Sequence, residues 1–462
     1  MLRRETWIQR RRDKWHSTRS APRTRGKAFA PSKINARRGS ADAKRRSPAD
    51  TSGIPVTSEL QPGAVAPEPP TSWFGVALGL GLGALAAYHL FKLPPVLPIL
   101  LQKYDYGLLA AGSFMSIYAA IGLATSALLG TRLQRYGMPP FLLAAALLFI
   151  AGSVITLAAP AAVAPMLVAR GLEGLGFAIL AVAAPVLATA SAGRRHKTIA
   201  IALFAAWIPL GQLVAMAVAH PFAEGAEWRP VWWAGIGLTV IVIALGWRAA
   251  QRHAPRRGAA DTGGPKPLSD FPRADRWALV LVAATFMLWS TEIFVMLTWL
   301  PQYLVEARGL GGEATILAYA VPSILVLIFN VLGGFLLRAG IPLAPLLVVS
   351  LAFQAAVWLL LPYLDGAALG LAGLVVFGIA AGITPTCLFA APALILGAEN
   401  AGGSAFGIVM TGRNVGVLVG PILLPPVLLA MGAWQGIGPV FGSITLAAAL
   451  AAMVLGVMLA RR

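Results

Sequence analysis

Two ten-residue stretches, GTRLQRYGMP at residues 130–139 and GGFLLRAGIP at residues 333–342, follow one pattern. Each has a glycine, an arginine five residues later, a second glycine two residues after that, and then a proline. The shift between them is 203 residues, and the same shift carries Leu97-Pro98 onto Leu300-Pro301. The sequence therefore predicts that the second half of the chain repeats the first.

Long apolar segments surround both stretches. The chain is 58% hydrophobic and 12% charged, whereas a soluble protein has roughly a quarter of its residues charged. A helix needs about twenty apolar residues to cross ~30 Å of hydrocarbon. Twelve such segments are predicted, at 73–93, 106–129, 141–159, 165–190, 198–220, 229–247, 276–300, 314–337, 342–361, 367–392, 402–430 and 436–459. We expect an all-α membrane protein of two pseudo-symmetric six-helix bundles.

Four regions follow from this pattern: a basic, disordered tail at 1–71, a first bundle at 72–247, a linker at 248–275 and a second bundle at 276–462. The net charge of +19 would suggest nucleic-acid binding in a soluble protein. Because 16 of the 37 basic residues lie in the tail, we expect a lipid bilayer and no nucleic acid as partner. The tail is either a contact to anionic headgroups, a solvated extension or a misassigned start.

The distribution of Lys and Arg predicts the orientation, because basic loops stay in the cytoplasm. One side holds Arg132, Arg135, Arg194, Arg195, Lys197, six basic linker residues, Arg338, Arg461 and Arg462. The opposite side holds Lys92, Lys103, Arg229 and Arg308. Both termini are therefore predicted to be cytoplasmic, in a multi-pass protein of the cell's inner or plasma membrane.

Three motifs resemble the major facilitator superfamily, and the resemblance covers residues 73–460. The stretch 130–139 is similar to its G-x-x-x-D-R-x-G-R-R loop, with Gln134 in place of the acid. The segment RGLEGLG at 170–176 is similar to R-x-x-Q-G-x-G, whereas WIPLGQ at 207–212 departs from the G-P-x-x-G-G pattern of proton-driven antiporters. Features at 298–306 and 402–421 look most like the cyanate-transporter group.

This resemblance implies a monomeric secondary transporter that works by alternating access around a site between the bundles. It implies a small anion as the leading substrate. Two other hypotheses remain open: an exporter of hydrophobic compounds, and a membrane sensor or scaffold that transports nothing. The sequence has no G-x-x-x-x-G-K-[ST], H-E-x-x-H or paired C-x-x-C motif, which argues against an enzyme, a cofactor and a metal site.

Charged residues inside the spans cost about 2.5–3.5 kcal/mol each, so they mark functional positions. The resemblance puts His89, Arg170, Glu173, Glu292 and Thr384 on the wall of a shared cavity. His89 and Glu292 are 203 residues apart and occupy equivalent positions. Our hypothesis is that they exchange a proton during the cycle. The alternative is a fixed polar contact that latches the outer gate.

Four further sets of residues have predicted roles. Arg170 and Glu173, three residues apart on one helix, either pair with each other or contact substrate. Arg413, next to Asn414 and far in sequence from any acid, is the best candidate to hold an anion; alternatively it pairs with Glu173 or Glu292, or caps carbonyl groups. We expect Gln212 and Asn330 to form hydrogen bonds between helices. Three arginines are predicted to latch the cytoplasmic gate, and they are Arg132, Arg135 and Arg338.

Overall fold

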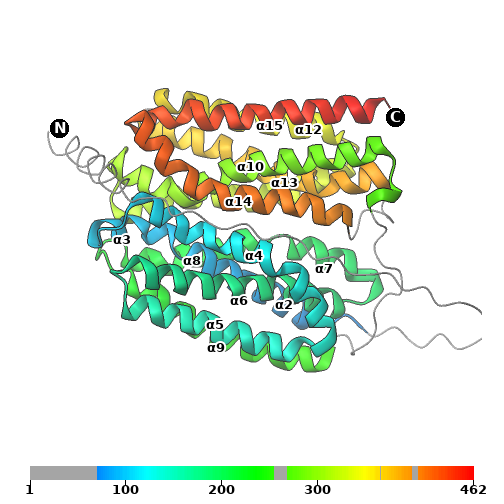
Figure 1. Cartoon of the computed structure of the whole chain (residues 1–462), viewed down its shortest axis with the longest axis horizontal. Coiled ribbons are helices and arrows are strands. Elements are labelled where there is room, and N and C mark those ends of the chain that lie inside the picture. Colours follow the sequence, from blue (N-terminus) through cyan, green and yellow to red (C-terminus); the bar gives the residue numbers. More distant parts are fainter. Residues whose placement is uncertain (1–69, 254–267, 365, 398–403, 462) are drawn as a thin grey trace, which may run out of the picture. The chain divides into compact units, whose positions relative to one another are not determined.

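The computed structural model describes residues 70–253, 268–364, 366–397 and 404–461, and the regular secondary structure in these ranges is helical (Figure 1). The predicted tail lies outside the described residues except for its last two positions, and so does the middle of the predicted linker. The first half contains α2 (Trp73–Phe91), η1 (Pro94–Val96), α3 (Leu97–Lys103), α4 (Leu108–Tyr136), α5 (Met138–Ala158), α6 (Val163–Ala190), η2 (Arg194–His196), α7 (Lys197–Phe204), α8 (Trp207–Ala219), η3 (His220–Phe222) and α9 (Arg229–His253).

The second half begins with η4 (Leu268–Asp270) and contains α10 (Arg273–Glu306), α11 (Gly312–Arg338), α12 (Leu343–Leu360), η5 (Leu361–Tyr363), α13 (Ala367–Leu396), α14 (Ser404–Met431), η6 (Trp434–Gly436) and α15 (Ile437–Ala460). Among the described residues, eleven helices are long and apolar enough to cross a membrane. The predicted all-helical fold is thus confirmed. The count of twelve membrane-spanning helices stays a prediction.

The prediction of twelve membrane-spanning helices and the eleven found differ at residues 198–220. One helix is predicted there, and the structure has two. α7 ends at Phe204 and α8 begins at Trp207, and the shorter apolar helix runs from Trp207 to Phe222. Pro209 lies near the start of α8. Proline has no N–H to bond to the carbonyl four residues earlier, and its ring clashes with that carbonyl. Pro209 therefore leaves the carbonyl of Ala205 without this bond, between the end of α7 and the start of α8.

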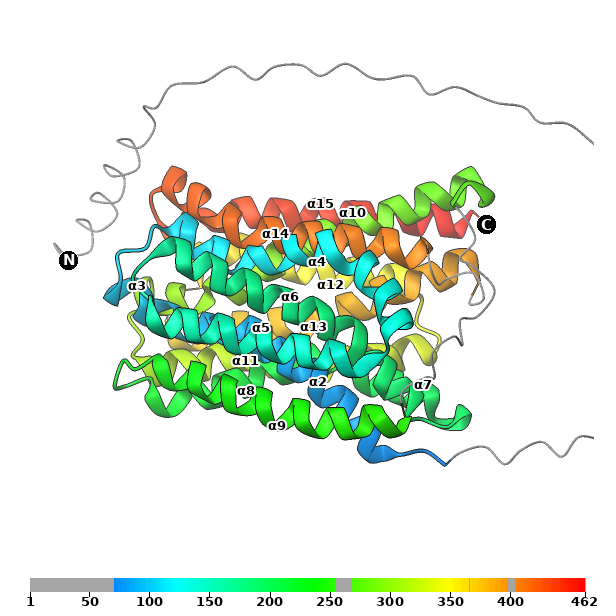
Figure 2. The same ribbon diagram turned by 60° about the horizontal axis from the view of Figure 1, so that its bottom comes forward.

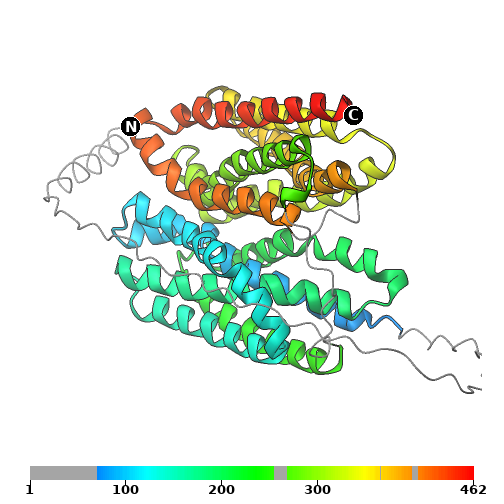
Figure 3. The same cartoon turned by 45° about the vertical axis from the view of Figure 1, so that its right-hand side comes forward.

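The helices form two groups, α2–α9 and α10–α15, which Figure 3 shows on opposite sides and Figure 2 shows from another direction. We call these groups the N-half and the C-half. In the N-half, α2 packs on α6, α8 and α9, α5 packs on α6 and α9, and α4 packs on α6. In the C-half, α10 packs on α13, α14 and α15, α12 packs on α13 and α15, and α11 packs on α13. The six pairings correspond one to one, so the repeat extends to the packing.

A glycine in each half fixes the register of this repeat. At Gly211 of α8, an added Cβ would collide with the backbone of α2, and at Gly416 of α14 it would collide with the backbone of α10. The residues met in the two halves differ by 203 in each case: Ala84, Ala87 and Tyr88 in α2, and Met287, Ser290 and Thr291 in α10. Each glycine therefore lets its helix approach the same surface of the first helix of its half.

Among the described residues, the polar contacts between the halves lie near the end of the molecule where α4 and α11 begin, which we call the contact end. Gln212 Nε2 donates to the hydroxyl of Tyr319 at 3.0 Å. This bond confirms the prediction that Gln212 joins two helices. Nearer the same end, His220 Nε2 lies 3.3 Å from Glu313 Oε1. These contacts hold the halves together at the contact end.

Candidate functional site

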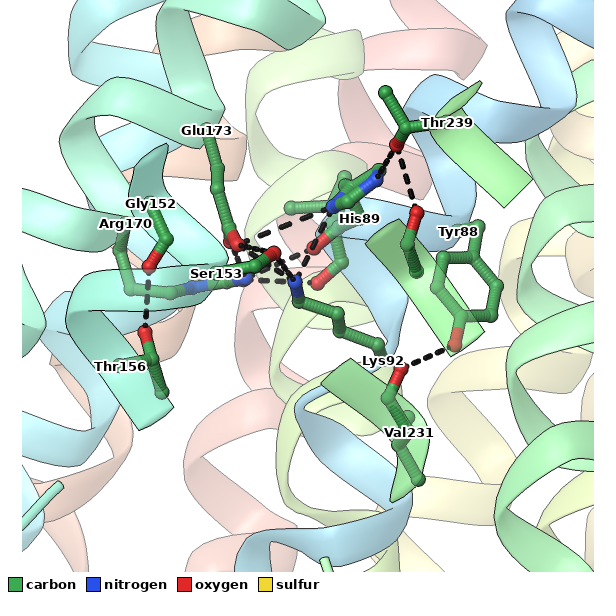
Figure 4. A network of polar contacts seen from close by, with 12 residues as sticks. Tyr88, His89, Lys92, Gly152, Ser153, Thr156, Arg170, Glu173, Val231 and Thr239 are labelled. Atoms are coloured by element: carbon green, nitrogen blue, oxygen red, sulfur yellow. Dashed lines mark hydrogen bonds and ion pairs between the residues drawn. The ribbon is translucent and has the colours of Figure 1, made fainter. Parts of the chain in front are cut away.

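The most polar region of the N-half interior joins the end of α2 to α6 (Figure 4). The ammonium of Lys92 lies 2.6 Å from Glu173 Oε1, and Arg170 Nη1 lies 2.7 Å from Glu173 Oε2. All three side chains have no exposed surface. Together with His89, Ser153 and Tyr118, which bond to them, we call these residues the N-half network. One carboxylate here compensates two buried cations.

The sequence at the end of α2 explains why Arg170 is held there. The carbonyl of Leu90 would bond the N–H four residues later, but that residue is Pro94, which has none. Arg170 Nη2 donates to this carbonyl at 3.0 Å, and Nη1 donates to the carbonyl of His89 at 2.8 Å. The guanidinium thus satisfies carbonyls left open at a helix terminus. The ion pair that the spacing of Arg170 and Glu173 suggested is present, with this capping role added.

Lys92 is the residue that sequence reasoning missed. By sequence it counts only among the basic residues of one membrane side, whereas in the structure it follows the last residue of α2 and has no exposed surface. Its Nζ lies within hydrogen-bonding distance of Glu173 Oε1 at 2.6 Å, Ser153 Oγ at 3.0 Å and His89 Nδ1 at 3.2 Å, and 4.9 Å from the centre of the Trp232 ring. The available signal was its place three residues after His89, on the same face of α2.

The second predicted acid has very different surroundings. Glu292 on α10 has no exposed surface. Its Oε2 accepts a hydrogen bond of 2.7 Å from the indole N–H of Trp358 on α12. Its Oε1 has no hydrogen-bond partner among the residues that the structure describes. Glu292 is therefore a buried acid with one neutral partner.

His89 and Glu292 each make their contacts inside their own half. The His89 ring stacks on Phe149 of α5 with ring centres 4.0 Å apart, and its Nε2 lies 2.8 Å from Thr239 Oγ1 on α9. Glu292 faces α12, the counterpart of α5. The expected exposure on a shared cavity wall is wrong for His89, Glu292, Arg170, Glu173 and Thr384, which all have no exposed surface.

The remaining polar candidates separate into buried and accessible groups. Thr384 is buried in the C-half, where its hydroxyl accepts a hydrogen bond from Gln354 Nε2 at 2.9 Å. Arg413 and Asn414 on α14 are half-buried, and Arg413 Nη1 donates to Asn414 Oδ1 at 3.0 Å. Within the described residues no acid forms a salt bridge with Arg413. α14 itself packs on α10 and, across the two halves, on α4.

The predicted gate residues lie at the end opposite the contact end. Arg132, Arg135 and Arg338 are exposed. The guanidinium of Arg135 lies 5.4 Å from the centre of the Tyr136 ring, and that of Arg338 lies 4.8 Å from the centre of the Phe335 ring. These contacts are local to each half, so the latch stays a prediction.

The C-half also encloses a cavity of about 500 Å³ near the contact end. It lies among α10, α12, α13, α14 and α15 and is lined by apolar and aromatic side chains, including Trp299, Tyr303, Trp358 and Trp434. In the described ranges there is no cluster of three His, Cys, Asp or Glu residues suited to a metal ion.

Comparison with known proteins agrees with this architecture. The model of the Major Facilitator Superfamily matches residues 76–421. A search of curated protein sequences finds no match. Among solved structures, a variant of the nucleoside transporter NupG superposes with a TM-score of 0.65 at 15% identity, covering 82% of this chain and 99% of that one. An inward-facing, occupied bacterial homologue of the human lysosomal transporter Spinster gives a TM-score of 0.63 at 16% identity, covering 85% of this chain and 96% of that one. At these identities the likeness concerns the fold alone.

Proposed function

Because the chain belongs to the Major Facilitator Superfamily, we propose that this multi-pass membrane transporter moves a small anionic solute by alternating access between its halves. The family and the fold identify a transporter and not an enzyme. One structural neighbour is named as a nucleoside transporter, and the other is named as a homologue of a lysosomal transporter, without a cargo. The substrate must therefore be argued from this chain's own residues.

The anion proposal depends on one observation: Arg413 has no acidic partner among the described residues. Lys92 and Arg170, the other cations deep in the spans, each form an ion pair with Glu173. Arg413 is half-buried, and within the described ranges it donates to the neutral amide of Asn414 and forms no salt bridge. A guanidinium presents a fork of donors that matches carboxylate-like oxygens. Arg413, with Asn414 beside it, is our proposed anion contact on a helix that packs against both halves.

Proton coupling is the second part of the proposal. Burying an ionised carboxylate without a cation is costly, and Glu292 has one neutral partner. A proton that Glu292 takes up and releases during the cycle would remove this cost. Since His89 bonds within the N-half network, we assign it a fixed polar contact there and assign the proton cycle to Glu292 alone.

We propose that both termini face the cytoplasm of an inner or plasma membrane. Basic residues concentrate on the side of Arg135 and Arg338, which are exposed. The burial of Lys92 removes one basic residue from the opposite side and so supports the asymmetry that this orientation needs. In this orientation the contact end is extracellular.

The test is transport by the purified chain in proteoliposomes with a pH-sensitive dye inside. Cyanate, nitrate, acetate and larger carboxylates are added outside one at a time. We expect anion-dependent proton movement that Arg413→Ala abolishes and Arg413→Lys lowers by about tenfold or more, because lysine lacks the planar fork. Lys103→Ala, which removes the same charge from an exposed position, is the matched control and should transport normally.

Two outcomes would reject parts of this proposal. Normal transport by Arg413→Lys and Arg413→Ala would remove the anion role. Full pH dependence in Glu292→Gln would remove the coupling role of that carboxyl. No signal for any anion, from protein that is folded by size-exclusion chromatography, would favour export of hydrophobic compounds or a role without transport.

A further inference from the structure

The C-half cavity has the size and lining of a ligand site. Small-molecule sites are clefts of about 300–1,000 Å³, mostly apolar, with a few polar groups, and this cavity measures about 500 Å³. Aromatic side chains from three separate elements line it: Trp299 and Tyr303 from α10, Trp358 from α12 and Trp434 from η6. Aromatic faces attract organic cations as well as apolar groups.

Glu292 lies next to this cavity, behind the ring of Trp358. Val295, Met296 and Trp299 of α10 line the cavity, and Glu292 precedes them by three, four and seven residues, so it shares their helix face. The ring of Trp358 lines the cavity while its N–H donates to Glu292. The indole thus separates the carboxylate from the cavity. Oε1 of Glu292 has no hydrogen-bond partner among the described residues, so no cation of this half compensates the carboxylate.

The N-half contains the arrangement that the C-half lacks. At the shift of 203 residues, Val295 of the cavity corresponds to Lys92. The Lys92 ammonium contacts a carboxylate at 2.6 Å and lies 4.9 Å from the centre of a Trp ring. In the C-half, valine provides no amine, the carboxylate is unpaired and a cavity remains. At this position the N-half has an ammonium group of its own, whereas the C-half has a valine that lines a cavity.

We propose that the C-half cavity binds a small organic ammonium compound, whose cation lies over the ring of Trp358 with the Glu292 carboxylate behind that ring as its counter-charge, and whose apolar part packs on Trp434. This site is separate from Arg413 and does not depend on anion transport. The one charged residue in the lining is Arg308, whose Nε donates to the Tyr303 hydroxyl at 2.7 Å. Glu306, on the last turn of α10, accepts from the indole of Trp434 at 2.9 Å and adds negative charge near the mouth.

A larger cavity in the same half illustrates what makes this one specific. It measures about 1030 Å³, lies at the opposite end among α11, α12, α13 and α15, and has an apolar lining without aromatic or titratable side chains. That lining suits any apolar molecule. Only the cavity beside Glu292, of these two, offers both aromatic faces and a counter-charge.

Binding is tested with the full chain in lipid nanodiscs by quenching of tryptophan fluorescence. The cationic probe is benzyltrimethylammonium, and the neutral probe of similar size is 2-methyl-4-phenyl-2-butanol. We expect the cation to bind at least about tenfold more tightly, which corresponds to about 1.4 kcal/mol. Glu292→Gln should remove this preference and leave binding of the alcohol within about twofold. Glu227→Gln, an exposed acid in the N-half, is the charge control.

A second pair of variants locates the site independently of Glu292. Gly370 lines the cavity, and a Cβ there meets nothing closer than 3.7 Å, so Gly370→Phe should fill the space and abolish binding of both probes. Gly237, on α9, has no atom within 4 Å of an added Cβ, and Gly237→Phe should bind both probes normally. Equal binding of the two probes by the wild type, or cation binding unchanged in both Glu292→Gln and Gly370→Phe, would overturn the proposal.

Discussion

The two halves of this transporter share a packing scheme but treat their buried acids in opposite ways. In the N-half, Glu173 is paired with Lys92 and Arg170 at 2.6 and 2.7 Å. In the C-half, Glu292 has one hydrogen bond, from the Trp358 indole, and a cavity of about 500 Å³ next to that indole. The two acids lie on helices that are not counterparts, Glu173 on α6 and Glu292 on α10, and each lies in the interior of its own half.

This difference assigns distinct tasks to the halves. A buried ion pair tolerates no change in charge, because removal of one partner leaves the other uncompensated in a medium of low dielectric constant. The N-half network therefore suits a fixed body. A buried acid without a cation is satisfied by a proton or by a cation from outside. In the C-half, Glu292 can therefore gain or lose a proton without leaving a buried cation uncompensated.

The largest predicted effect is the loss of the central acid of the N-half network. Glu173→Gln leaves Lys92 and Arg170 buried without a counter-charge, so we expect stability to fall by about 3–5 kcal/mol, the usual cost of breaking a buried pair. Thermal unfolding of the purified protein in detergent measures this loss. Glu227→Gln, at an exposed position, should unfold like the wild type.

The stability of Glu173→Gln also tests whether the N-half network is rigid. If Glu173→Gln retains wild-type stability, water or lipid must reach Lys92 and Arg170, and the N-half network is not the rigid element described above. Lower protein yield alone does not decide this question. The measurement is the unfolding midpoint of the fraction that elutes as a folded species.

The second prediction concerns what the halves have in common. Gly211→Ala and Gly416→Ala each place a methyl group against backbone atoms of the first helix, and overpacking of this kind costs about 1–3 kcal/mol. Because the residues met are related by the same shift, the two losses should agree within about 1 kcal/mol. Gly237→Ala, which meets open space, is the control. A large loss for one glycine alone would show that the repeat does not extend to packing strength.

The repeat was predictable because close contact between helix backbones favours glycine, and proline is common next to helix ends, whatever else surrounds them. The matching loops at 130–139 and 333–342 and the near alignment of Gly211 with Gly416 carry this signal in the sequence. The break between α7 and α8 was missed although Pro209 marked it. A long apolar run outweighed a single proline in that prediction.

The direction in which each polar side chain points was not predictable. Periodicity places a residue on a helix face, but whether that face meets the other half or its own depends on how the helix is rotated in the bundle. His89, Glu292 and Thr384 all face inward within their halves. Lys92 was misplaced because it follows the last apolar turn of α2, and only the fold brings Glu173 and Ser153 to it.

The smallest predicted effect tests the C-half directly. Glu292→Gln keeps an oxygen that can accept from Trp358 and removes an uncompensated charge, so we expect stability to change by no more than about 1 kcal/mol, and the change can be a gain. Trp358→Phe removes the one hydrogen bond of the carboxylate and should cost about 1–3 kcal/mol, less when Gln is already present at position 292. The four unfolding midpoints form a double-mutant cycle, and its coupling energy measures the bond between these side chains. A loss for Glu292→Gln as large as that for Glu173→Gln would mean that Glu292 has a strong partner after all. The contrast between a paired N-half and an open C-half would then fail, and with it the reason to expect an external cation at this carboxylate.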